Sequence, residues 1–424
     1  MKHLIIGNSA AGVAAAETIR QQDPKCSITI ISNEEKPYYS RCRLADYITG
    51  EIQIDKMLVK NLDFYRQQDI TLLSGQLVTA VSPEEQTVTL ASGKKLEFDR
   101  LLIATGASNF FPPVPGISSE GVYGLRTLAD ADRIRAACSG AKNVVVIGGG
   151  LVGLEAAEAL LDQGLKVTVV EKINQLLPIQ LDEAAANIVT AALMEKGMRI
   201  ITGTGFTAIN KTSWLGKLFG KPKLTVSLEN GEVLPADFVI VATGTRPNTS
   251  IVRETSIEVN RGILVNQQME TNIEGIFAAG DVAESVDAVT GEIGVTPIWP
   301  NAVRQGKLAG LNMAGKKING EPLIAMQNSL TLGGIDIISL GLVNPPKGSD
   351  HRIMVGANRD GSYKKLVLQG NVLQGVVLVG KVEQAGVYGA LIKSRKPLTQ
   401  SMAALMEDSF GYGKLLSNLP NKAG

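Results

Sequence analysis

Cys42 lies between two arginines, in the stretch EEKPYYSRCRLADYITG that spans residues 34–50. Near the start of a helix and flanked by Arg41 and Arg43, this cysteine would be favoured in its thiolate form, which is the form that attacks disulfides. Cys42 is therefore either a redox-active thiol that exchanges electrons with a substrate, or a small apolar residue beside chemistry that occurs elsewhere. The choice depends on what surrounds it in the chain.

A first glycine-rich turn follows a short apolar strand and precedes an alanine-rich helix, in HLIIGNSAAGVAAAETI. Gly7, Ser9 and Gly12 occupy the positions of the G-x-G-x-x-G motif. There the first glycine makes the turn, the second lets backbone approach a pyrophosphate, and the third allows the helix to pack closely on the strand. Ser9 departs from the motif but is small. After the next strand, SITIIS, comes Glu34, 27 positions after Gly7, a suitable place for a carboxylate that binds a ribose.

A second glycine-rich turn, in NVVVIGGGLVGLEAAEAL, carries the same motif intact at Gly148, Gly150 and Gly153. Its next strand, KVTVV, ends on Glu171, 23 positions after Gly148. A carboxylate there accepts hydrogen bonds from the ribose hydroxyls of NAD and repels the extra phosphate of NADP, so we expect NADH. Two complete units predict two bound dinucleotides. The alternative is a pair of glycine-rich turns that only pack helices on sheets.

In three later segments a predicted buried strand is followed by a turn that contains small residues. The segments LLIATGA (101–107) and FVIVATGTRPN (238–248) each run into an Ala-Thr-Gly turn, and TNIEGIFAAGDVAE (271–284) ends on Gly280 and Asp281. A carboxylate after such a strand can bond a ribityl hydroxyl and face the pyrophosphate of a flavin. This arrangement indicates that one of the two dinucleotides is FAD.

A helix is predicted to begin near Asn301 or Ala302, in PIWPNAVRQGKLAGLNMAG. A helix N-terminus carries partial positive charge and free N–H donors. Directed at the N1 and C2 carbonyl region of a flavin, it would stabilise the negative charge of the reduced ring. The alternative is a surface helix with an ordinary cap.

The composition suits layered α/β domains. The chain has 424 residues, which suggests about three domains, and it is 44% hydrophobic and 4% aromatic with 45 glycines. A net charge of +1 gives no indication of a nucleic-acid partner. The three cysteines are isolated and form no C-x-x-C pair, so we expect neither a dithiol motif nor a bound metal. The first residues run directly into a strand–turn–helix pattern, so we do not expect a secretory leader. No apolar run approaches the ~20 residues of a membrane span, so we expect a cytoplasmic protein without a transmembrane segment.

Taken together, these motifs resemble the FAD- and NAD-dependent pyridine nucleotide oxidoreductases of the two-dinucleotide fold, over roughly residues 1–318. The resemblance implies an α/β fold with an FAD-binding domain at 1–111 and 243–318, an NAD-binding domain at 112–242, and a C-terminal α+β interface domain at 319–424. In this family the last domain usually forms a dimer or docks a partner. We therefore expect a homodimer or a subunit of a hetero-oligomer.

Within the family, ITIISNEEKPYYSRCRL is similar to NADH:rubredoxin reductases and to the NADH-binding part of nitrite reductases, in which proline is common at the position of Cys42. Similar chains serve as NADH-handling subunits of anaerobic iron–sulfur complexes. Glu155, in LVGLEAAE, stands where the family's glutamate contacts the nicotinamide carboxamide, although it could also be an ordinary helical glutamate. The predicted cofactor-binding residues are Gly7, Ser9, Ala10, Ala11, Gly12, Glu34, Arg41, Ala104, Thr105, Gly106, Gly148, Gly150, Leu151, Val152, Gly153, Glu171, Gly244, Gly280, Asp281 and Ala302.

The family also contains coenzyme A disulfide reductases and NADH oxidases that have a cysteine at this place, with a Tyr or Leu five positions on and a Gly three later. Cys42, Tyr47 and Gly50 fit that spacing. Against a catalytic Cys42, the oxidases and peroxidases carry a histidine in the first glycine turn where this chain has Ala10. The coenzyme A disulfide reductases have a Tyr-rich, proline-containing signature near the C-terminus, where this chain reads MEDSFGYGKLL.

A thiol relay also needs an acid–base partner, and the chain has only two histidines, His3 in the first strand and His351 in a polar loop. We therefore expect an FAD enzyme that takes hydride from NADH and passes electrons singly to rubredoxin, ferredoxin or an iron–sulfur partner subunit, or runs in reverse. Its alternatives are an NADH-dependent disulfide, CoA-disulfide or persulfide reductase that uses Cys42, and a non-catalytic NADH-sensing subunit.

One segment is not explained by the two cofactors. NKTSWLGKLFGKPKLTV (210–226) interrupts the small sheet expected in the NAD-binding domain and combines Trp214 and Phe219 with several lysines. It is either a docking patch for an acidic electron carrier or partner subunit, or a hairpin tip that packs on its own domain.

Overall fold

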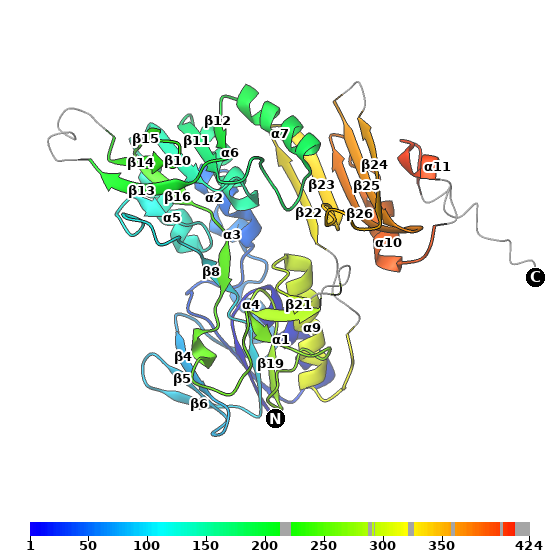
Figure 1. The fold of residues 1–424 in the computed structure, drawn as a ribbon. Helices are drawn as coiled ribbons and strands as arrows, with labels where there is room; N and C mark the ends of the chain where they lie inside the picture. The colour runs from blue at the N-terminus through cyan, green and yellow to red at the C-terminus, as the bar shows by residue number, and fades with distance from the viewer. Residues whose placement is uncertain are drawn as a thin grey trace, which may run out of the picture. The chain divides into compact units, whose positions relative to one another are not determined.

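The structure, a computed structural model, describes residues 1–212, 222–286, 291, 293–320, 326–357, 361–398 and 402–411. The chain forms two compact units, Met1–Phe110 with Thr245–Ile324 and Phe111–Gly244 with Ala325–Gly424. The chain therefore passes from the first unit to the second, returns to the first, and ends in the second, as the colours of Figure 1 show. The predicted boundaries of three separate domains stay a prediction.

The first unit is built on a five-stranded parallel sheet with the strand order β19-β7-β1-β2-β3. Both faces of its central strands are buried, which is why they read as nearly continuous apolar runs such as LLI and TII. The strands are β1 (Lys2–Ile6), β2 (Ser27–Ile31), β3 (Ile70–Leu73), β7 (Arg100–Ile103) and β19 (Ile276–Ala278).

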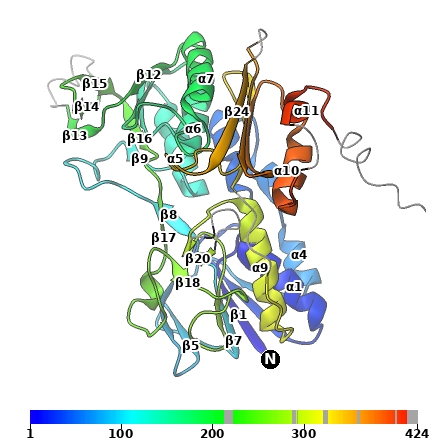
Figure 2. The same ribbon diagram turned by 45° about the vertical axis from the view of Figure 1, so that its right-hand side comes forward.

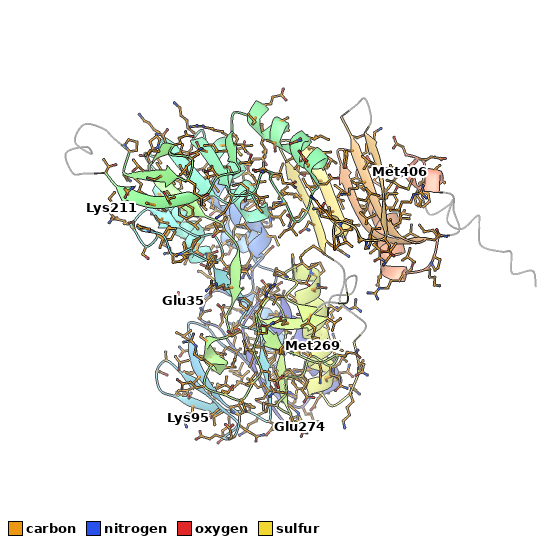
Figure 3. The ribbon with its side chains drawn as sticks, viewed as in Figure 1. Glu35, Lys95, Lys211, Met269, Glu274 and Met406 are labelled. Carbon is orange, nitrogen blue, oxygen red and sulfur yellow. The ribbon has the colours of Figure 1, made fainter. Side chains whose placement is uncertain are left out.

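Helices and a second sheet cover the two faces of this sheet. Helices α1 (Ala10–Gln22) and α9 (Trp299–Met313) lie side by side on one face, in a core that also contains Met269 (Figures 1, 2 and 3). The antiparallel strands β4 (Val78–Ser82), β5 (Thr87–Leu90) and β6 (Lys95–Glu97) form a second sheet, and apolar residues of β4, β5 and the turn after β6 pack on the other face.

The remaining elements of the first unit are short. They are η1 (Arg41–Arg43), α2 (Leu44–Thr49), α3 (Ile54–Met57), α4 (Leu62–Gln67), β8 (Ala107–Asn109), β17 (Thr245–Pro247), η2 (Ser250–Val252), β18 (Ile263–Leu264), β20 (Ala283–Val286) and β21 (Ile293–Gly294). Helix α9 begins at Trp299, two or three residues earlier than predicted. Its second residue is Pro300, which is favoured in the first turn because its ring fixes a helical φ and no N–H is needed there.

The second unit repeats this plan with the strand order β12-β11-β10-β16-β9. Helix α6 (Leu151–Asp162) packs against β10 and β11, while the antiparallel strands β13, β14 and β15 cover the other face. The parallel strands are β9 (Val122–Tyr123), β10 (Asn143–Ile147), β11 (Lys166–Glu171), β12 (Arg199–Thr202) and β16 (Phe238–Val241); the others are β13 (Phe206–Lys211), β14 (Leu224–Leu228) and β15 (Val233–Ala236), with helices α5 (Leu128–Cys138) and α7 (Glu183–Glu195). The segment 213–221, which holds most of the proposed docking loop, lies outside the described residues.

The C-terminal part of the second unit is a five-stranded antiparallel sheet with the order β22-β23-β26-β25-β24. Asp182 joins it to the parallel part of the unit: its carboxylate caps α7, accepts a hydrogen bond of 2.6 Å from Tyr363 and pairs with Lys365 at 3.0 Å. The elements are β22 (Gln327–Leu332), β23 (Ile335–Gly341), β24 (His351–Ala357), β25 (Tyr363–Gln369), β26 (Val372–Val379), α10 (Ala385–Ser394) and α11 (Met402–Met406).

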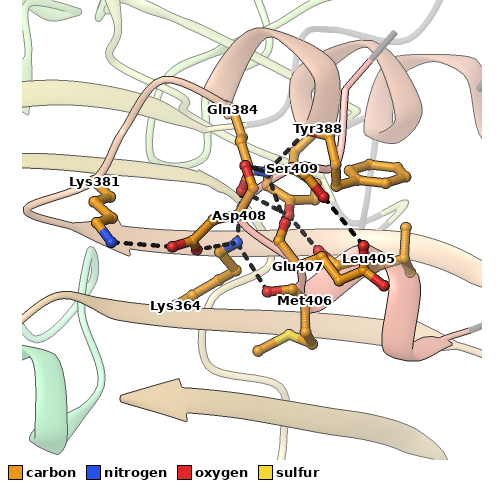
Figure 4. A network of polar contacts seen from close by, with 10 residues as sticks. Lys364, Lys381, Gln384, Tyr388, Leu405, Met406, Glu407, Asp408 and Ser409 are labelled. Carbon is orange, nitrogen blue, oxygen red and sulfur yellow. Dashed lines mark hydrogen bonds and ion pairs between the residues drawn. The ribbon is translucent and has the colours of Figure 1, made fainter. Parts of the chain in front are cut away.

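A polar network fixes the last described segment on this sheet (Figure 4). The Gln384 amide donates to the backbone carbonyls of Glu407, Asp408 and Phe410 at 2.8–2.9 Å. Lys364, which is buried, donates to Gln384 Oε1 at 2.6 Å and pairs with Asp408 at 3.7 Å. Burial lowers the pKa of Lys364, and the carboxylate of Asp408 opposes that shift.

The predicted α/β class, with two parallel sheets and a C-terminal sheet, is confirmed. Among the helices of the described residues, none has both the length and the hydrophobicity that crossing a membrane requires.

Candidate functional site

The first glycine turn is closed by steric contacts that only glycine permits. Gly7 has a φ of +122°, and a Cβ there would lie 2.0 Å from the carbonyl oxygen of Ala104 at the end of β7. A Cβ on Gly12 would lie 2.0 Å from the carbonyl oxygen of Gly7. The turn, the first turn of α1 and the end of β7 are therefore packed against one another through their backbones.

Ser9 is the N-cap of α1, and its side chain makes no capping hydrogen bond with the described residues. Helix α1 starts with Ala10 and Ala11, and its first turn contains no acidic residue. The N–H groups of a first turn have no partner inside the helix. With no side chain satisfying them, these groups can bind an anion, and a phosphate fits this end of a helix.

The Gly280–Asp281 turn and the start of α9 meet α1. Gly280 has a φ of +81°, and a Cβ there would lie 3.2 Å from the Cβ of Ala11 and 3.8 Å from the Cβ of Ala302. Three segments that the sequence assigned to one cofactor, the first of them more than 250 residues before the other two, thus come together at the carboxyl end of the first sheet.

Gln305 holds this junction and was missed by the sequence analysis. Its side chain is 2% exposed; Oε1 accepts from the backbone N–H of Gly280 at 2.7 Å, and Nε2 donates to Ser285 Oγ at 3.3 Å. One buried amide therefore fixes the position of α9 relative to the Gly-Asp turn. A glutamine in a predicted helix gives no local sign of such a role.

Glu34 and Arg41, both predicted cofactor-binding residues, form an ion pair, and Tyr39 donates its hydroxyl hydrogen to the same carboxylate. The Arg41 guanidinium also lies 5.4 Å from the centre of the Tyr39 ring. Burial disfavours the charge of Arg41, but Tyr39, Glu34 and Asp281 together raise its pKa. Asp281 is therefore close enough to Arg41 to belong to the same charged group of residues.

Cys42 lies in η1 and is exposed, and the helix after it, α2, ends at Gly50 with a φ of +81°. Tyr38 is buried nearby. Its burial raises the pKa of Tyr38 to about 12, Cys42 adds to the rise, and a hydrogen bond with Trp299 opposes it. Cys42, Tyr38 and Trp299 thus share one neighbourhood at the start of α9. Trp299 is 41% exposed, and the sequence analysis assigned no role to Trp299 or Tyr38.

The first Ala-Thr-Gly turn, Ala104 to Gly106, is held by Asn248, which the sequence analysis missed. Asn248 accepts from Thr105 Oγ at 2.8 Å through its backbone oxygen and donates to the Thr105 carbonyl at 2.9 Å through its side chain. Its backbone N–H donates to the carbonyl of Gly106 at 2.9 Å. These bonds join the two crossing segments of the chain beside the paired strands β8 and β17.

The second glycine turn has nearly the same geometry as the first. Gly148 has a φ of +113°, and a Cβ there would lie 2.3 Å from the carbonyl oxygen of Ala242 at the end of β16. A Cβ on Gly153 would lie 2.0 Å from the carbonyl oxygen of Gly148. Gly150 is the N-cap of α6, which starts with Leu151.

The carboxylate of Glu171 is bound to this second turn. Its Oε2 accepts from the backbone N–H of Gly149 at 2.6 Å and its Oε1 from that of Ile173 at 2.9 Å. Val152, in the first turn of α6, is 44% exposed, and Glu155 lies one turn further on and is partly buried. Gly244, with a φ of +106°, follows β16. A carboxylate beside an open helix N-terminus suits a ribose bound next to a pyrophosphate.

Two family descriptions match the chain. Residues 1–306 match Pyridine nucleotide-disulphide oxidoreductase, and residues 327–396 match Rubredoxin NAD+ reductase C-terminal domain.

Individual relatives match over nearly the whole chain. The chain is 31% identical to the NADH-dependent phenylglyoxylate dehydrogenase subunit epsilon of Aromatoleum evansii, over 97% of this chain and 96% of that one. It is 30% identical to the NADH-rubredoxin oxidoreductase of Clostridium acetobutylicum, over 93% and 95% of the two chains. Among solved structures, the NAD-dependent persulfide reductase from A. fulgidus superimposes with a TM-score of 0.88 at 28% identity, covering 97% of this chain and 80% of that one.

Proposed function

We propose that this chain passes its electrons to a protein acceptor. The chain belongs to the pyridine nucleotide-disulphide oxidoreductase family and is an NAD(P)H-dependent flavin oxidoreductase of the ferredoxin and rubredoxin reductase kind. The acceptor is a protein that takes one electron at a time: a rubredoxin, a ferredoxin or an iron–sulfur partner subunit. The family resemblance drawn from the sequence is confirmed by the matches to both parts of the chain.

The family binds FAD and NAD(P)H, and the residues of the two glycine turns fit such ligands. In the first turn Gly7 and Gly12 allow the turn to pack closely on the end of β7 and on the start of α1, whose backbone N–H groups could then bind a ligand's phosphates. Asp281 would accept a hydrogen bond from a hydroxyl of the ribityl chain, and Glu34 would accept hydrogen bonds from a ribose. When bound, FAD accepts two electrons together as hydride from NADH and releases them one at a time.

The main evidence for the proposal is the family match of the C-terminal segment. Residues 327–396 match the C-terminal domain of rubredoxin NAD+ reductases, a class of enzyme named for a one-electron carrier. A relative at 30% identity is named for the same acceptor, and one at 31% is named as a subunit of a larger dehydrogenase. Trp299 supports the proposal because an exposed aromatic ring at the start of α9 can contact a docked carrier beside the proposed flavin site.

We propose NADH as the reductant because Glu171 places a carboxylate beside the second glycine turn, where it would repel the additional phosphate of NADPH. Glu155 would contact the nicotinamide carboxamide. The assembly that we propose is a homodimer or a subunit of a hetero-oligomer.

A second candidate function is the reduction of a disulfide or a persulfide through Cys42. It is favoured by the similarity to a persulfide reductase over 97% of this chain and by the exposure of Cys42. The spacing to Tyr47 and Gly50 also fits, with Gly50 ending α2 in the left-handed conformation. Ala10, in place of a histidine, counts against the peroxide-reducing and oxygen-reducing members of this group.

One set of assays separates these functions. The purified protein is given NADH with rubredoxin, with ferredoxin, or with coenzyme A disulfide and a glutathione persulfide, and ferricyanide serves as the positive control for reduction of FAD by NADH. We expect two carrier molecules to be reduced for each NADH, at a rate that exceeds reduction of either sulfur substrate. Faster turnover of a sulfur substrate that disappears in Cys42→Ser would establish the second function instead. Absence of flavin absorbance and of ferricyanide reduction would indicate a non-catalytic subunit.

A further inference from the structure

The first glycine turn contains a buried amide NH2 group that no hydrogen bond within the described residues satisfies. Asn8 lies between Gly7 and Ser9, and its Oδ1 accepts a hydrogen bond of 2.7 Å from the hydroxyl of Tyr65 on α4. Its Nδ2 is buried and has no hydrogen-bond partner among the described residues. Buried donors are nearly always satisfied, so one that is not requires an explanation.

Tyr65 determines which way this amide faces. The Tyr65 hydroxyl accepts from the backbone N–H of Tyr38 at 3.3 Å, so its single hydrogen is available to donate to Asn8. A hydroxyl has one hydrogen and an amide has one acceptor oxygen. If the Asn8 amide were turned over, its NH2 group would face the Tyr65 hydroxyl, and the hydroxyl hydrogen would lose this acceptor. The amide is therefore held with its oxygen toward Tyr65 and its NH2 group away from it.

The position of Asn8 identifies the kind of acceptor that its NH2 group lacks. The backbone of this turn is where a dinucleotide's pyrophosphate approaches, between the first glycine and the open N-terminus of α1. We propose that Asn8 is a flavin-binding residue whose Nδ2 donates to a phosphate oxygen of FAD, with Tyr65 as the positioning residue that holds its amide. This inference rests on the assignment of FAD to the first glycine turn in the proposed function.

A comparison with the second glycine turn shows that only the first turn carries an amide side chain at this position. Gly149 occupies the position equivalent to Asn8, and a Cβ there would lie 2.6 Å from Leu176 and 3.0 Å from the Cβ of Glu171. A side chain at that position would require Leu176 to shift, and the backbone N–H of Gly149 is already bound by Glu171. An amide donor from the loop side chain is therefore available only in the first turn.

The test measures flavin affinity rather than turnover. The full-length protein is stripped of FAD and titrated with FAD and with riboflavin, which has no phosphate. We expect Asn8→Ala to weaken FAD binding by about 10- to 100-fold, the range for a lost hydrogen bond to a charged group. Asn8→Asp keeps the acceptor for Tyr65 but places a carboxylate against the pyrophosphate, so it should weaken FAD binding further. Tyr65→Phe frees the amide to rotate and also removes the acceptor of the Tyr38 N–H, and it should weaken FAD binding several-fold. Riboflavin affinity should stay within twofold in all three variants.

Thermal stability of the flavin-free proteins provides the control for a merely structural role. Asn61 caps α4 through a hydrogen bond of 3.1 Å to the backbone N–H of Phe64, so Asn61→Ala should lower stability and leave FAD affinity unchanged. The inference is overturned if Asn8→Ala binds FAD within twofold of wild type, if Asn8→Asp binds it better than Asn8→Ala, or if riboflavin affinity falls equally. A wild-type protein that binds FAD and oxidises NADH but reduces no carrier would overturn the proposed acceptor and leave this inference standing.

Discussion

The two glycine turns share their steric design but differ in what surrounds them. In both, a Cβ on the first glycine would lie within 2.3 Å of a carbonyl oxygen, and a Cβ on the last would lie 2.0 Å from the first glycine's own oxygen. Yet Ala11, in the first turn of α1, is 5% exposed, while Val152, its equivalent in α6, is 44% exposed. The same local backbone is thus enclosed in one unit and open in the other.

The carboxylates differ in the same way. Glu34 is held by the side chains of Tyr39 and Arg41, whereas Glu171 is held by backbone N–H groups of its own turn and of Ile173. Helix α9 also packs closely on α1, since a Cβ on Gly306 would lie 2.1 Å from the carbonyl oxygen of Ala11. An enclosed site suits a cofactor that stays bound, and an open one suits a substrate that must enter and leave at each turnover.

The strongest test of this difference replaces the last glycine of each turn, Gly12 or Gly153. A methyl group on Gly12 or Gly153 would overlap a carbonyl oxygen at 2.0 Å, and overpacking of this kind costs at least 1–3 kcal/mol. We expect Gly12→Ala to purify with little or no FAD, and Gly153→Ala to keep FAD while its reduction by NADH falls on the order of a hundredfold. Flavin content by absorbance and anaerobic stopped-flow reduction measure the two effects. Loss of FAD from Gly153→Ala would mean that the turns do not act separately.

Acid should weaken the first sheet more than the second, because β1 carries His3 where β10 carries Val144. Both are buried, and burial lowers the pKa of His3 to about 4 from an ordinary value of 6.5. The unfolded chain therefore binds a proton between pH 6.5 and 4 that the folded chain does not. His3 should cost about 3 kcal/mol of unfolding free energy as the pH falls through that window, with no further loss below it.

Urea unfolding of wild type and His3→Val at pH 7.5 and pH 4.2 checks this expectation. His3→Val copies the residue of β10, so the difference between the two proteins should shift in favour of the variant as the pH falls. An equal pH dependence in both proteins would show that His3 is not the titrating group.

The open site should be the one whose specificity can be changed. Glu171→Arg removes the repulsion of the NADPH phosphate and adds a cation that can pair with it, so the ratio of kcat/KM for NADPH to that for NADH should rise by roughly 10- to 100-fold. Because Glu171 also binds the N–H of Gly149, Glu171→Gln serves as the control that keeps an acceptor and removes only the charge. Ferricyanide reduction measures both ratios. A native preference for NADPH would contradict the assignment.

The smallest effect is expected at Cys42. If electrons leave the flavin directly for a carrier, Cys42→Ser should slow turnover at most a few-fold, because it preserves size and removes only the thiolate. If Cys42 carries a covalent step, the loss should be on the order of a thousandfold or more. Anaerobic titration gives a second measurement: one equivalent of NADH is expected for FAD alone, and about two, with a long-wavelength charge-transfer band, if an oxidised Cys42 adduct is coupled to it.

Features that depend on residues close in sequence could be predicted. Both strand–turn–helix units, and the strands that carry Glu171 and Gly280, were predicted from apolar runs and glycine spacing. The sequence analysis began α9 at Asn301 or Ala302, a little late, because Pro300 is accepted inside the first turn of a helix.

Features that depend on distant residues could not be predicted. Asn8 is fixed by Tyr65, 57 residues away, and Thr105 by Asn248, 143 residues away. Asn, Gln and Tyr are common on surfaces and in cores, and the sequence does not show which of them meet. The same holds for Gln384, whose amide binds three carbonyls more than twenty residues later in the chain.

The crossing of the chain between its two units has a consequence for biosynthesis. Strand β7 ends at residue 103, and the strand that pairs with its other edge, β19, begins at residue 276. At a ribosomal rate of roughly 5–20 residues per second, the edge of β7 waits on the order of 10–35 s for its partner. During that time a newly made chain carries an unpaired edge on an apolar sheet, which is a template for aggregation. The nascent chain should therefore need a chaperone until α9 has emerged, and the first site can take up its cofactor only after translation has passed residue 313.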